Sequence, residues 1–310
     1  MRHFLGFSEL SSKELLNLLE RAIEIKKNPK KFSKRLLQKN MLMLFEQPSV
    51  RTRLSFETGL TQLGGHAIYY DIKESTLGKK ETIGDYAKTV SRYVDVIGAR
   101  LNNHEQIVQL SKNSDVPVIN MMSNFEHPCQ GLADFLTILE HKKKLKGLKL
   151  AYVGDANNNV TNTLLFGGAL LGMDISVGCP DNTELMTNPT IVEQVQKTAK
   201  KNNAKINLFH SAKEAVRNAD VVYTDSWMSY RIPEEAAAGR INQLHPFQVN
   251  SQLMKHAKKD AIFLHCLPAS RGHEVTDEVM DSKQSAVFDQ AENRLHCQKA
   301  LLLELFKKNR

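Results

Sequence analysis

The sequence predicts an α/β fold with a doubly wound parallel sheet in each half of the chain. The chain has 310 residues, a length typical of about two domains. Short continuous apolar runs alternate with longer segments of helical periodicity, which is typical of parallel strands buried on both faces. The expected strands are residues 41–45, 66–71, 94–100 and 116–122 in the first half, and 148–155, 173–178, 204–210, 219–225, 261–266 and 285–289 in the second.

The boundary between the two domains is expected near residue 146. Residues 131–144 have apolar positions at helical spacing and end in cations, which favour a helix C-terminus. Gly147 then interrupts the pattern before the next strand. The sequence therefore predicts a first domain over residues 1–146 and a second over 147–291. An amphipathic helix over about residues 292–310 is expected to pack back on the first domain.

Composition excludes several classes of protein. Hydrophobic residues make up 41% of the chain and charged residues 25%, which is typical of a globular protein. No apolar run approaches the roughly 18–20 residues needed to cross a bilayer, and no secretory signal is visible at the start. The four cysteines form no CxxC pair, which favours a reduced, cytoplasmic chain.

The formal net charge of +8 is compatible with nucleic acid, an anionic membrane surface or an anionic small substrate. A lysine-rich solvated surface accounts for most of the excess more simply. The arginines gather at predicted strand ends and not along a stripe. We therefore expect neither nucleic acid nor a membrane as a partner.

The first candidate site follows the predicted strand 41–45. Ser49 is a good N-cap for a helix, and the free N–H groups of a first helical turn attract anions. Arg51, Thr52 and Arg53 lie in this same turn. Two guanidinium groups with two hydroxyls suit a doubly charged phosphate, because guanidinium binds phosphate through two parallel hydrogen bonds. An ordinary capped helix with exposed arginines is the alternative.

The second candidate site lies at two further strand ends of the first half. His127 and Gln130 bracket a proline after the strand 116–122, and Arg100 ends the strand 94–100. Open α/β sheets bind ligands at the carboxyl ends of their strands. Histidine can donate a hydrogen bond to a carbonyl oxygen, and glutamine can both donate and accept. His127 and Gln130 alone are equally compatible with a helix cap.

The second half carries polar residues at three strand ends. Cys266 is compatible with a nucleophile, a metal ligand or a polar pocket wall, and no cysteine–histidine spacing supports a zinc site. The segment 154–159 lacks the later glycines of a dinucleotide loop, which argues against a nicotinamide dehydrogenase. Its asparagines suit an amino-acid head group, and Asp225 suits an ammonium group, with Ser229 nearby in sequence.

These motifs, in this order, resemble the aspartate/ornithine carbamoyltransferase family over nearly the whole chain. Residues 49–53 fit the SxRTR motif, residues 127–130 fit HPxQ, and residues 265–268 fit HCLP. Residues 292–296 are similar to the family's late arginine segment. The aspartate branch has a proline where this chain has Cys266, so Cys266 favours the ornithine branch.

The resemblance implies a carbamoyl-phosphate-binding domain (1–146) and an ornithine-binding domain (147–291), joined by two helices. It also implies a homotrimer or a multiple of a trimer, with a loop of the neighbouring subunit completing the phosphate site. The matching segment here contains Thr76 and Lys80, and its sequence is closer to the aspartate branch. A solvated loop lysine is the alternative for Lys80.

The implied reaction transfers the carbamoyl group of carbamoyl phosphate to the δ-amine of L-ornithine, giving L-citrulline and phosphate, without metal or cofactor. The catalytic set would be Arg51, Thr52, Arg100, His127 and Cys266. The phosphate would be held by Ser49, Arg51, Thr52, Arg53 and Arg100, and the carbonyl oxygen by Thr52, Arg100 and His127. The rest of the carbamoyl phosphate site would be Gln130, Cys266, Leu267 and Arg294, with Arg294 closing it from the second domain.

Ornithine would contact Asn159, Asp225, Ser229 and Tyr230. The family's usual SMG sequence here is Ser229-Tyr230-Arg231. If the side chain at position 230 shapes the pocket, the acceptor could be another amine, such as putrescine or a modified ornithine. The resemblance leaves open whether the reaction serves arginine synthesis or citrulline breakdown.

Overall fold

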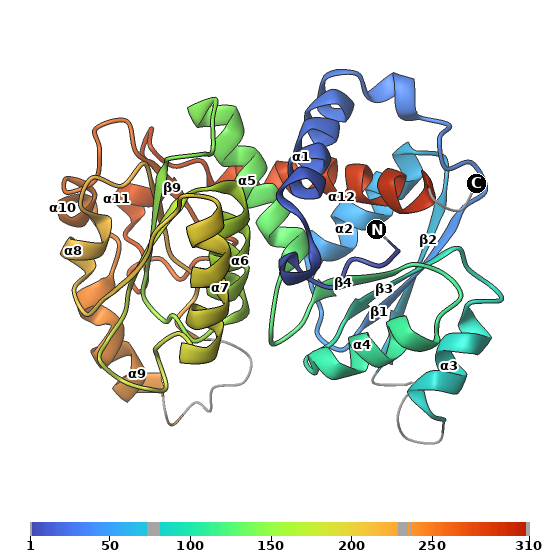
Figure 1. Ribbon diagram of the computed structural model, residues 1–310, viewed down its shortest axis with the longest axis horizontal. Coiled ribbons are helices and arrows are strands. Elements are labelled where there is room, and N and C mark those ends of the chain that lie inside the picture. Colours follow the sequence, from blue (N-terminus) through green and yellow to red (C-terminus); the bar gives the residue numbers. More distant parts are fainter. Residues whose placement is uncertain (1, 73–80, 229–234, 236, 308–310) are drawn as a thin grey trace. The chain divides into compact units, whose positions relative to one another are not determined.

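The computed structural model describes residues 2–72, 81–228, 235 and 237–307, and the chain divides into two compact units (Figure 1). The first unit comprises Met1–Leu136 and Glu292–Arg310, and the second comprises Thr137–Ala291. The divisions fall within two helices, α5 (Pro128–Lys142) and α12 (Val287–Lys307). These are the two linking helices that the resemblance implied. The domain boundaries at 146 and 291 stay predictions.

The first unit contains a four-stranded parallel sheet in the order β2-β1-β3-β4. Its strands are β1 (Asn40–Phe45), β2 (His66–Asp71), β3 (Val96–Arg100) and β4 (Val118–Met122). β1, β3 and β4 are buried almost throughout, as their continuous apolar sequences predict, whereas the edge strand β2 alternates between exposed and half-buried residues.

Helices cover both faces of this sheet (Figure 1). On one face, α3 (Ile83–Val90) and α4 (His104–Asn113) pack against the sheet through a core that includes Ala87, Ile107 and Leu110. The other face carries α1 (Ser12–Lys27), α2 (Val50–Gln62) and the part of α12 that belongs to this unit. The sheet is therefore doubly wound, as predicted.

The second unit contains a five-stranded parallel sheet in the order β7-β6-β5-β8-β9. Its strands are β5 (Lys149–Val153), β6 (Asp174–Gly178), β7 (Ile206–Phe209), β8 (Val221–Tyr223) and β9 (Ile262–Leu264). The predicted strand 285–289 is wrong: Ser285 forms only an isolated bridge to Phe263, and α12 begins at Val287. The apolar run there belongs to a buried helix start, which periodicity cannot distinguish from a short strand.

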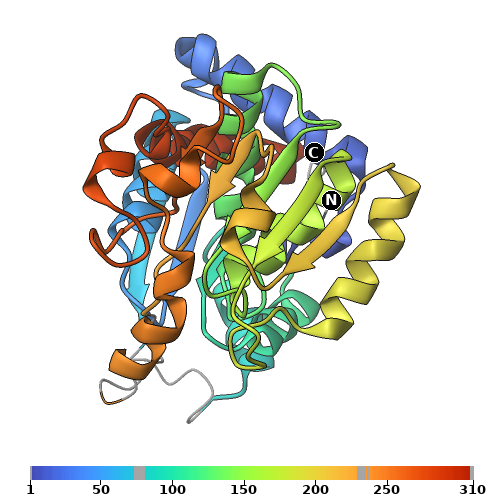
Figure 2. The ribbon, with the colours of Figure 1, turned by 90° about the vertical axis from the view of Figure 1, so that its left-hand side faces the viewer.

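The helices of the second unit also lie on both faces of its sheet (Figures 1 and 2). α6 (Asn159–Leu171) and α7 (Pro189–Lys201) pack together on one face. The other face carries α8 (Ala212–Val216), α10 (Ser251–Met254) and α11 (Asp277–Met280) around a core with Phe247 and Phe263. The remaining helix, α9 (Ala237–Leu244), precedes α10 in the chain.

The strand orders fix where a ligand can bind. In each sheet the chain adds strands first on one side of the starting strand and then on its other side. This reversal lies between β1 and β3 in the first unit and between β5 and β8 in the second. Ligands of doubly wound folds bind at the carboxyl ends of the strands on either side of such a reversal. The predicted site residues follow β1, β3 and β4 in the first unit and β5, β8 and β9 in the second.

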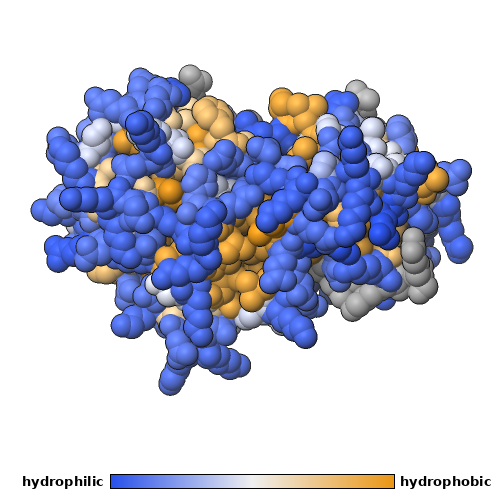
Figure 3. All heavy atoms as spheres, turned by 90° about the horizontal axis from the view of Figure 1, so that it is seen from above, coloured by the Kyte–Doolittle hydropathy of each residue, from blue (hydrophilic) through white to orange (hydrophobic). Residues whose placement is uncertain are grey.

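Hydrophilic residues cover most of the face shown in Figure 3. Within the described part of the chain, no helix is both long and apolar enough to cross a membrane.

Candidate functional site

The phosphate-type cluster begins at the N-terminus of α2. Ser49 caps the helix, and its Oγ accepts a hydrogen bond from the Thr52 backbone N–H at 3.3 Å, as the sequence predicted. The Ser49 hydroxyl also donates to Thr52 Oγ1 at 3.1 Å. The side chain of Thr52 is fully buried. The Ser49 cap thus fixes the Thr52 hydroxyl in the first turn of α2, the helix that follows β1.

Thr52 Oγ1 is the point where distant parts of the first unit meet. Arg100, at the end of β3, donates from Nη1 to Thr52 Oγ1 at 3.5 Å. Arg294, on α12, donates from Nη2 to the same oxygen at 3.2 Å. Both arginines are more than nine-tenths buried. Arg294 therefore belongs to the first unit, and the expectation that it closes the site from the second domain is wrong, because α12 continues into the first unit.

Gln130 completes this cluster from the first turn of α5. Its Oε1 accepts a hydrogen bond from Arg294 Nη1 at 2.7 Å, and its Nε2 donates to Asp134 Oδ1 at 2.7 Å. These two contacts fix the orientation of the amide. The oxygen of Gln130 therefore faces the arginines, and a carbonyl oxygen has a second acceptor position for a ligand N–H.

His127 lies among three guanidinium groups. Burial lowers the pKa of His127 well below 6.5, and the charges of Arg294, Arg100 and Arg51 lower it further. The imidazole is therefore neutral at pH 7 and can donate a hydrogen bond from one nitrogen. Gathering buried positive charges costs free energy, which a bound anion would offset.

Among the predicted phosphate ligands that the structure describes, Arg53 turns to other partners. Its Nε donates to Glu57 Oε1 at 2.9 Å, and its guanidinium lies 4.1 Å from the centre of the Tyr69 ring. About half of the side chain is exposed. The arginine therefore rests on the surface beside β2, and its role as a phosphate ligand stays a prediction.

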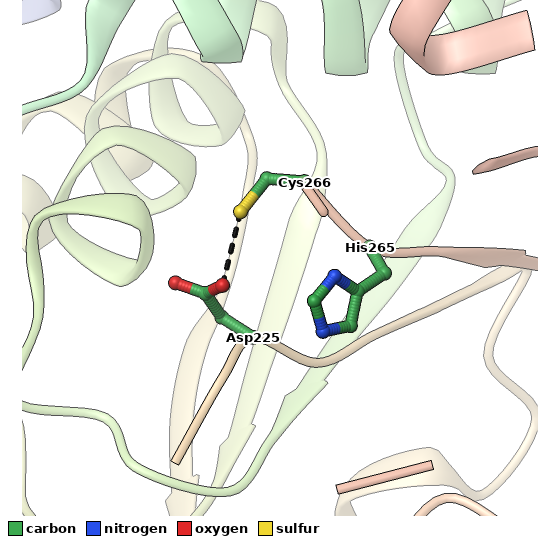
Figure 4. A group of neighbouring side chains, drawn as sticks. All are labelled: Asp225, His265 and Cys266. Atoms are coloured by element: carbon green, nitrogen blue, oxygen red, sulfur yellow. Dashed lines mark hydrogen bonds between the residues drawn. The ribbon is translucent and has the colours of Figure 1, made fainter. Parts of the chain in front are cut away.

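In the second unit the ends of β8 and β9 bring Asp225 and Cys266 together. The Cys266 thiol donates to Asp225 Oδ1 at 2.9 Å (Figure 4). The same carboxylate oxygen accepts from the Ser226 N–H at 2.8 Å, which fixes the side chain of Asp225. A carboxylate beside a thiol suits an amine, as the sequence predicted for Asp225.

His265 stands beside this pair but is held differently. Its Nδ1 accepts from the Leu267 backbone N–H at 2.8 Å, and its Nε2 lies 3.3 Å from Glu274 Oε1. The ligand atoms of Asp225, His265 and Cys266 lie within 4.8 Å of one another. A metal would need a lone pair on His265, whereas Nδ1 accepts a hydrogen bond and Nε2 faces a carboxylate. The contacts fit hydrogen bonding better than metal binding.

The remaining predicted residues divide into two groups. Leu267 follows Cys266, and Asn159 is the first residue of α6, whose N-cap is Asn158. Both lie at the carboxyl end of the second sheet. Thr76, Lys80, Ser229 and Tyr230 lie outside the described residues.

Comparison with known proteins identifies the family. Residues 2–140 match the description "Aspartate/ornithine carbamoyltransferase, carbamoyl-P binding domain", and residues 146–305 match "Aspartate/ornithine carbamoyltransferase, Asp/Orn binding domain". The chain belongs to the aspartate/ornithine carbamoyltransferase family. The family resemblance expected from the motifs is thereby confirmed.

Relatives and solved structures agree with this assignment. An ornithine carbamoyltransferase from Methanobrevibacter smithii is 49% identical over 294 residues, covering 95% of this chain and 96% of the relative. The ornithine carbamoyltransferase structure from Pyrococcus furiosus has a TM-score of 0.93 at 44% identity, covering 97% of this chain and 96% of that one. An anabolic ornithine carbamoyltransferase from Campylobacter jejuni has a TM-score of 0.92 at 38% identity, covering 99% and 100%.

Sequence reasoning missed several residues that hold this carbamoyltransferase site in place. Gln290 fixes the turn at His265 by accepting from its backbone N–H, and the buried carboxylate of Glu274 lies 3.3 Å from His265 Nε2. Arg240 donates to Asp155 and to the Trp227 carbonyl, and so joins two strand-end loops. Glu126 is buried directly before His127. A charged residue between an apolar strand and a motif histidine was the available signal for Glu126.

Proposed function

We propose that this chain transfers the carbamoyl group of carbamoyl phosphate to the δ-amine of L-ornithine, giving L-citrulline and phosphate. The observation that carries the proposal is the convergence of three guanidinium groups on His127 beside the Thr52 hydroxyl. Such a cluster suits a phosphate joined to a polarisable carbonyl. Relatives named ornithine carbamoyltransferase, similar over nearly their full length, support the choice of acceptor.

In the proposed site the phosphate is bound by Ser49, Arg51, Thr52, Arg53 and Arg100. Thr52, Arg100 and His127 donate to the carbonyl oxygen, where negative charge develops as the amine attacks. Donors that are already oriented before the reaction stabilise such charge most effectively. Gln130 Oε1 and the backbone near Leu267 accept from the carbamoyl amide. Arg294, tied to both Gln130 and Thr52, joins the phosphate side of the site to the carbamoyl side.

The acceptor is placed by the second unit in this proposal. Asn159, Asp225, Ser229 and Tyr230 bind ornithine, and Cys266 lies beside its side-chain amine. The carboxylate of Asp225 attracts the ammonium form, so this residue positions the amine and does not activate it. Once neutral, the δ-nitrogen attacks the carbamoyl carbon. A C–N bond forms and the carbon–oxygen bond to phosphate breaks.

The departing phosphate is the proposed acceptor of the amine proton. An alkyl amine has a reference pKa of about 10.4, so a proton must be lost before or during attack. The lowered pKa of His127 makes its imidazole a poor base. Phosphate is more basic, is produced at the reacting carbon and needs no further group. No metal or cofactor enters the proposed reaction.

We propose a homotrimer, or a multiple of one, in which Thr76 and Lys80 of a neighbouring subunit approach the phosphate. Exposed apolar side chains on α2 and β2 support an interface on the first unit. Val50 is 70% exposed and Leu54 55%, and Ile68 and Tyr70 on β2 are about 40% exposed. Light scattering on the purified protein tests the trimer, and a Lys80→Ala variant tests the loop.

The proposed direction is anabolic, within arginine biosynthesis, and the proposed location is the cytoplasm. Anabolic ornithine carbamoyltransferases among the similar proteins, from Pyrococcus furiosus and Campylobacter jejuni, support the direction. Growth of an arginine-requiring host carrying the gene tests it. Fractionation of the source cells tests the location.

A citrulline assay tests the proposed function. Purified protein and carbamoyl phosphate are supplied with L-ornithine, putrescine or L-aspartate in parallel. We expect citrulline from ornithine and no product from the other two amines. Product from putrescine alone would retain the carbamoyl phosphate half of the proposal and overturn the acceptor. No product from any amine would overturn both.

A further inference from the structure

The side chain of Glu126 is a buried acid directly before His127. None of its surface is exposed. Its Oε2 accepts a hydrogen bond from the Phe7 backbone N–H at 2.8 Å, and its Oε1 accepts from Ser8 Oγ at 3.1 Å. Acidic side chains are rarely buried so completely, because desolvation of a carboxylate is costly. A residue that bears this cost next to a site residue calls for a functional explanation.

The partners of Glu126 belong to an N-terminal strap, defined here as residues 4–8, which runs beside β4. The Phe4 N–H donates to the Val118 carbonyl at 2.8 Å, and the Asn120 N–H donates to the Phe4 carbonyl at 2.8 Å. Asn120 Nδ2 also donates to the Leu5 carbonyl at 2.8 Å. The strap is thus fixed to a buried strand before it reaches Glu126.

The strap passes Glu126 so closely that a glycine is required. A Cβ added to Gly6 would lie 2.2 Å from Glu126 Oε1. Any side chain at position 6 would therefore force the carboxylate to move. The glycine allows the backbone to pass the acid while the Phe7 N–H points at it.

On its other side Glu126 is part of the turn that carries His127. The Ser123 N–H donates to the Glu126 carbonyl at 3.0 Å, and the Glu126 N–H donates to Ser123 Oγ at 3.3 Å. The His127 carbonyl then accepts from the N–H groups of Gln130 and Gly131 in the first turn of α5. Glu126 is therefore the junction between the strap and the turn that sets the position of His127.

We propose that Glu126 is a positioning residue for His127, holding it through the N-terminal strap. The inference rests on the proposed function, in which His127 donates to the carbonyl oxygen. Bound at both ends, the turn allows the ring little movement. Preorganised donors lose much of their effect when misplaced by about 1 Å.

The decisive experiment compares Glu126→Ala with Glu126→Gln in the citrulline assay. Glutamine can accept from the Phe7 N–H and donate to the Ser8 hydroxyl, so both contacts survive. We expect Glu126→Ala to lower kcat by about ten- to a hundredfold, with less than about a threefold change in KM for carbamoyl phosphate because the phosphate ligands are untouched. Glu126→Gln should stay within about threefold of wild type. Glu9→Ala, at an exposed residue directly after the strap, is the matched control and should leave kcat unchanged.

A double-mutant cycle shows whether the effect passes through His127. In a His127→Asn background, Glu126→Ala should lower kcat no more than about twofold further, because the residue it positions is gone. Gly6→Ala should reproduce the loss seen in Glu126→Ala, because the added methyl displaces the carboxylate. In the Glu126→Ala background, Gly6→Ala should lower kcat little further, because the carboxylate that it displaces is already absent.

The outcomes separate this inference from the proposed function. If wild-type protein makes citrulline but Glu126→Ala and Gly6→Ala keep its kcat, Glu126 does not position His127. If Glu126→Ala lowers kcat by the same factor in wild type and in the His127→Asn background, the inference is also overturned, because equal losses indicate a general structural effect. If wild-type protein makes no citrulline, the proposed function fails. In that case, the carbon resonances of His127, measured by nuclear magnetic resonance in wild type and in Gly6→Ala, test whether Glu126 positions His127. Unchanged resonances would overturn this role, and shifted or broadened resonances would support it.

Discussion

The two units build their candidate sites at the same place in the same kind of sheet but with opposite chemistry. In the first unit, Arg51, Arg100 and Arg294 place positive charge around His127. In the second unit, the carboxylate of Asp225 accepts a hydrogen bond from the thiol of Cys266. The doubly wound fold supplies a ligand site at a strand reversal in both cases. In the proposed function, the side chains at the strand ends therefore decide whether an anion or an amine binds there.

The two sites also differ in how they are assembled. The cluster of the first unit joins α2, β3, α5 and α12, segments that are far apart in the sequence: Thr52 accepts from Arg100 and Arg294, and Arg294 also donates to Gln130. The pair of Asp225 and Cys266 in the second unit rests on the adjacent strands β8 and β9. A change in the first cluster therefore disturbs several elements, whereas a change in the second stays local. The expected effects below run from the largest to the smallest.

The largest effect is expected for Arg51→Ala. This change removes a charge-assisted contact to the phosphate, and kcat/KM should fall about a hundred- to a thousandfold, or about 3–4 kcal/mol. Steady-state kinetics with both substrates varied measures the loss. A variant with near wild-type kcat/KM would remove Arg51 from the site.

The next effect concerns stability and follows from the buried acid of the first unit. Burial raises the pKa of Glu126 from 4.5 to about 7, against the hydrogen bonds from Phe7 and Ser8. The folded chain therefore keeps a proton that the unfolded chain loses above pH 4.5. The stability linked to this group is complete below pH 4.5 and is lost as the pH rises through 7.

Denaturant unfolding of wild type and Glu126→Gln between pH 4.5 and 7.5 measures this linkage. Because glutamine does not titrate, the free energy of unfolding of the wild type should fall relative to the variant by up to about 3 kcal/mol across this range. A difference that does not change with pH would show that Glu126 titrates normally in the folded chain.

A smaller and more selective effect is expected for Asp225→Asn in the second unit. Loss of the carboxylate should raise KM for ornithine about ten- to fiftyfold, or about 1.4–2.3 kcal/mol, because a charge-assisted contact to the amine is lost. KM for carbamoyl phosphate should change less than about twofold. An equal rise in both KM values would show that the two halves do not divide the substrates as proposed.

The smallest effect is expected for Arg53→Ala. The guanidinium of Arg53 is half-exposed, is paired with Glu57 and lies over Tyr69, so it must give up these contacts to bind the phosphate, and exposed charge pairs contribute about 1 kcal/mol or less. We expect kcat/KM to fall less than about fivefold. A loss as large as that of Arg51→Ala would mean that the two arginines contribute equally to phosphate binding.

Local sequence patterns predicted most of the fold because buried parallel strands have a distinctive apolar signature. β1 to β9 all lie within or close to the predicted ranges. The error at residues 285–289 arose where an apolar run begins a buried helix, a case in which strand and helix share the same short pattern. The Ser49 cap was predictable because capping depends on residues three apart.

The candidate site was less predictable because its geometry depends on contacts between distant segments. The motifs indicated Thr52, Arg100 and Gln130, but nothing local shows that Arg294 reaches Thr52 from α12. Nor does the sequence show that Arg53 turns to Tyr69 while the charge of Arg51 lowers the pKa of His127. Glu126 was missed because its partners lie in the N-terminal strap, more than a hundred residues earlier.

The central claim is that the first unit binds the phosphate and the second binds the amino acid. Calorimetric titration with two ligands tests it most directly: a small phosphonate analogue of carbamoyl phosphate, and the same phosphonate joined to the δ-nitrogen of ornithine. We expect Arg51→Ala to weaken both ligands, and Asp225→Asn to weaken only the ligand that carries ornithine. If Asp225→Asn weakens the small phosphonate as much as Arg51→Ala does, the division of the substrates between the two units is wrong.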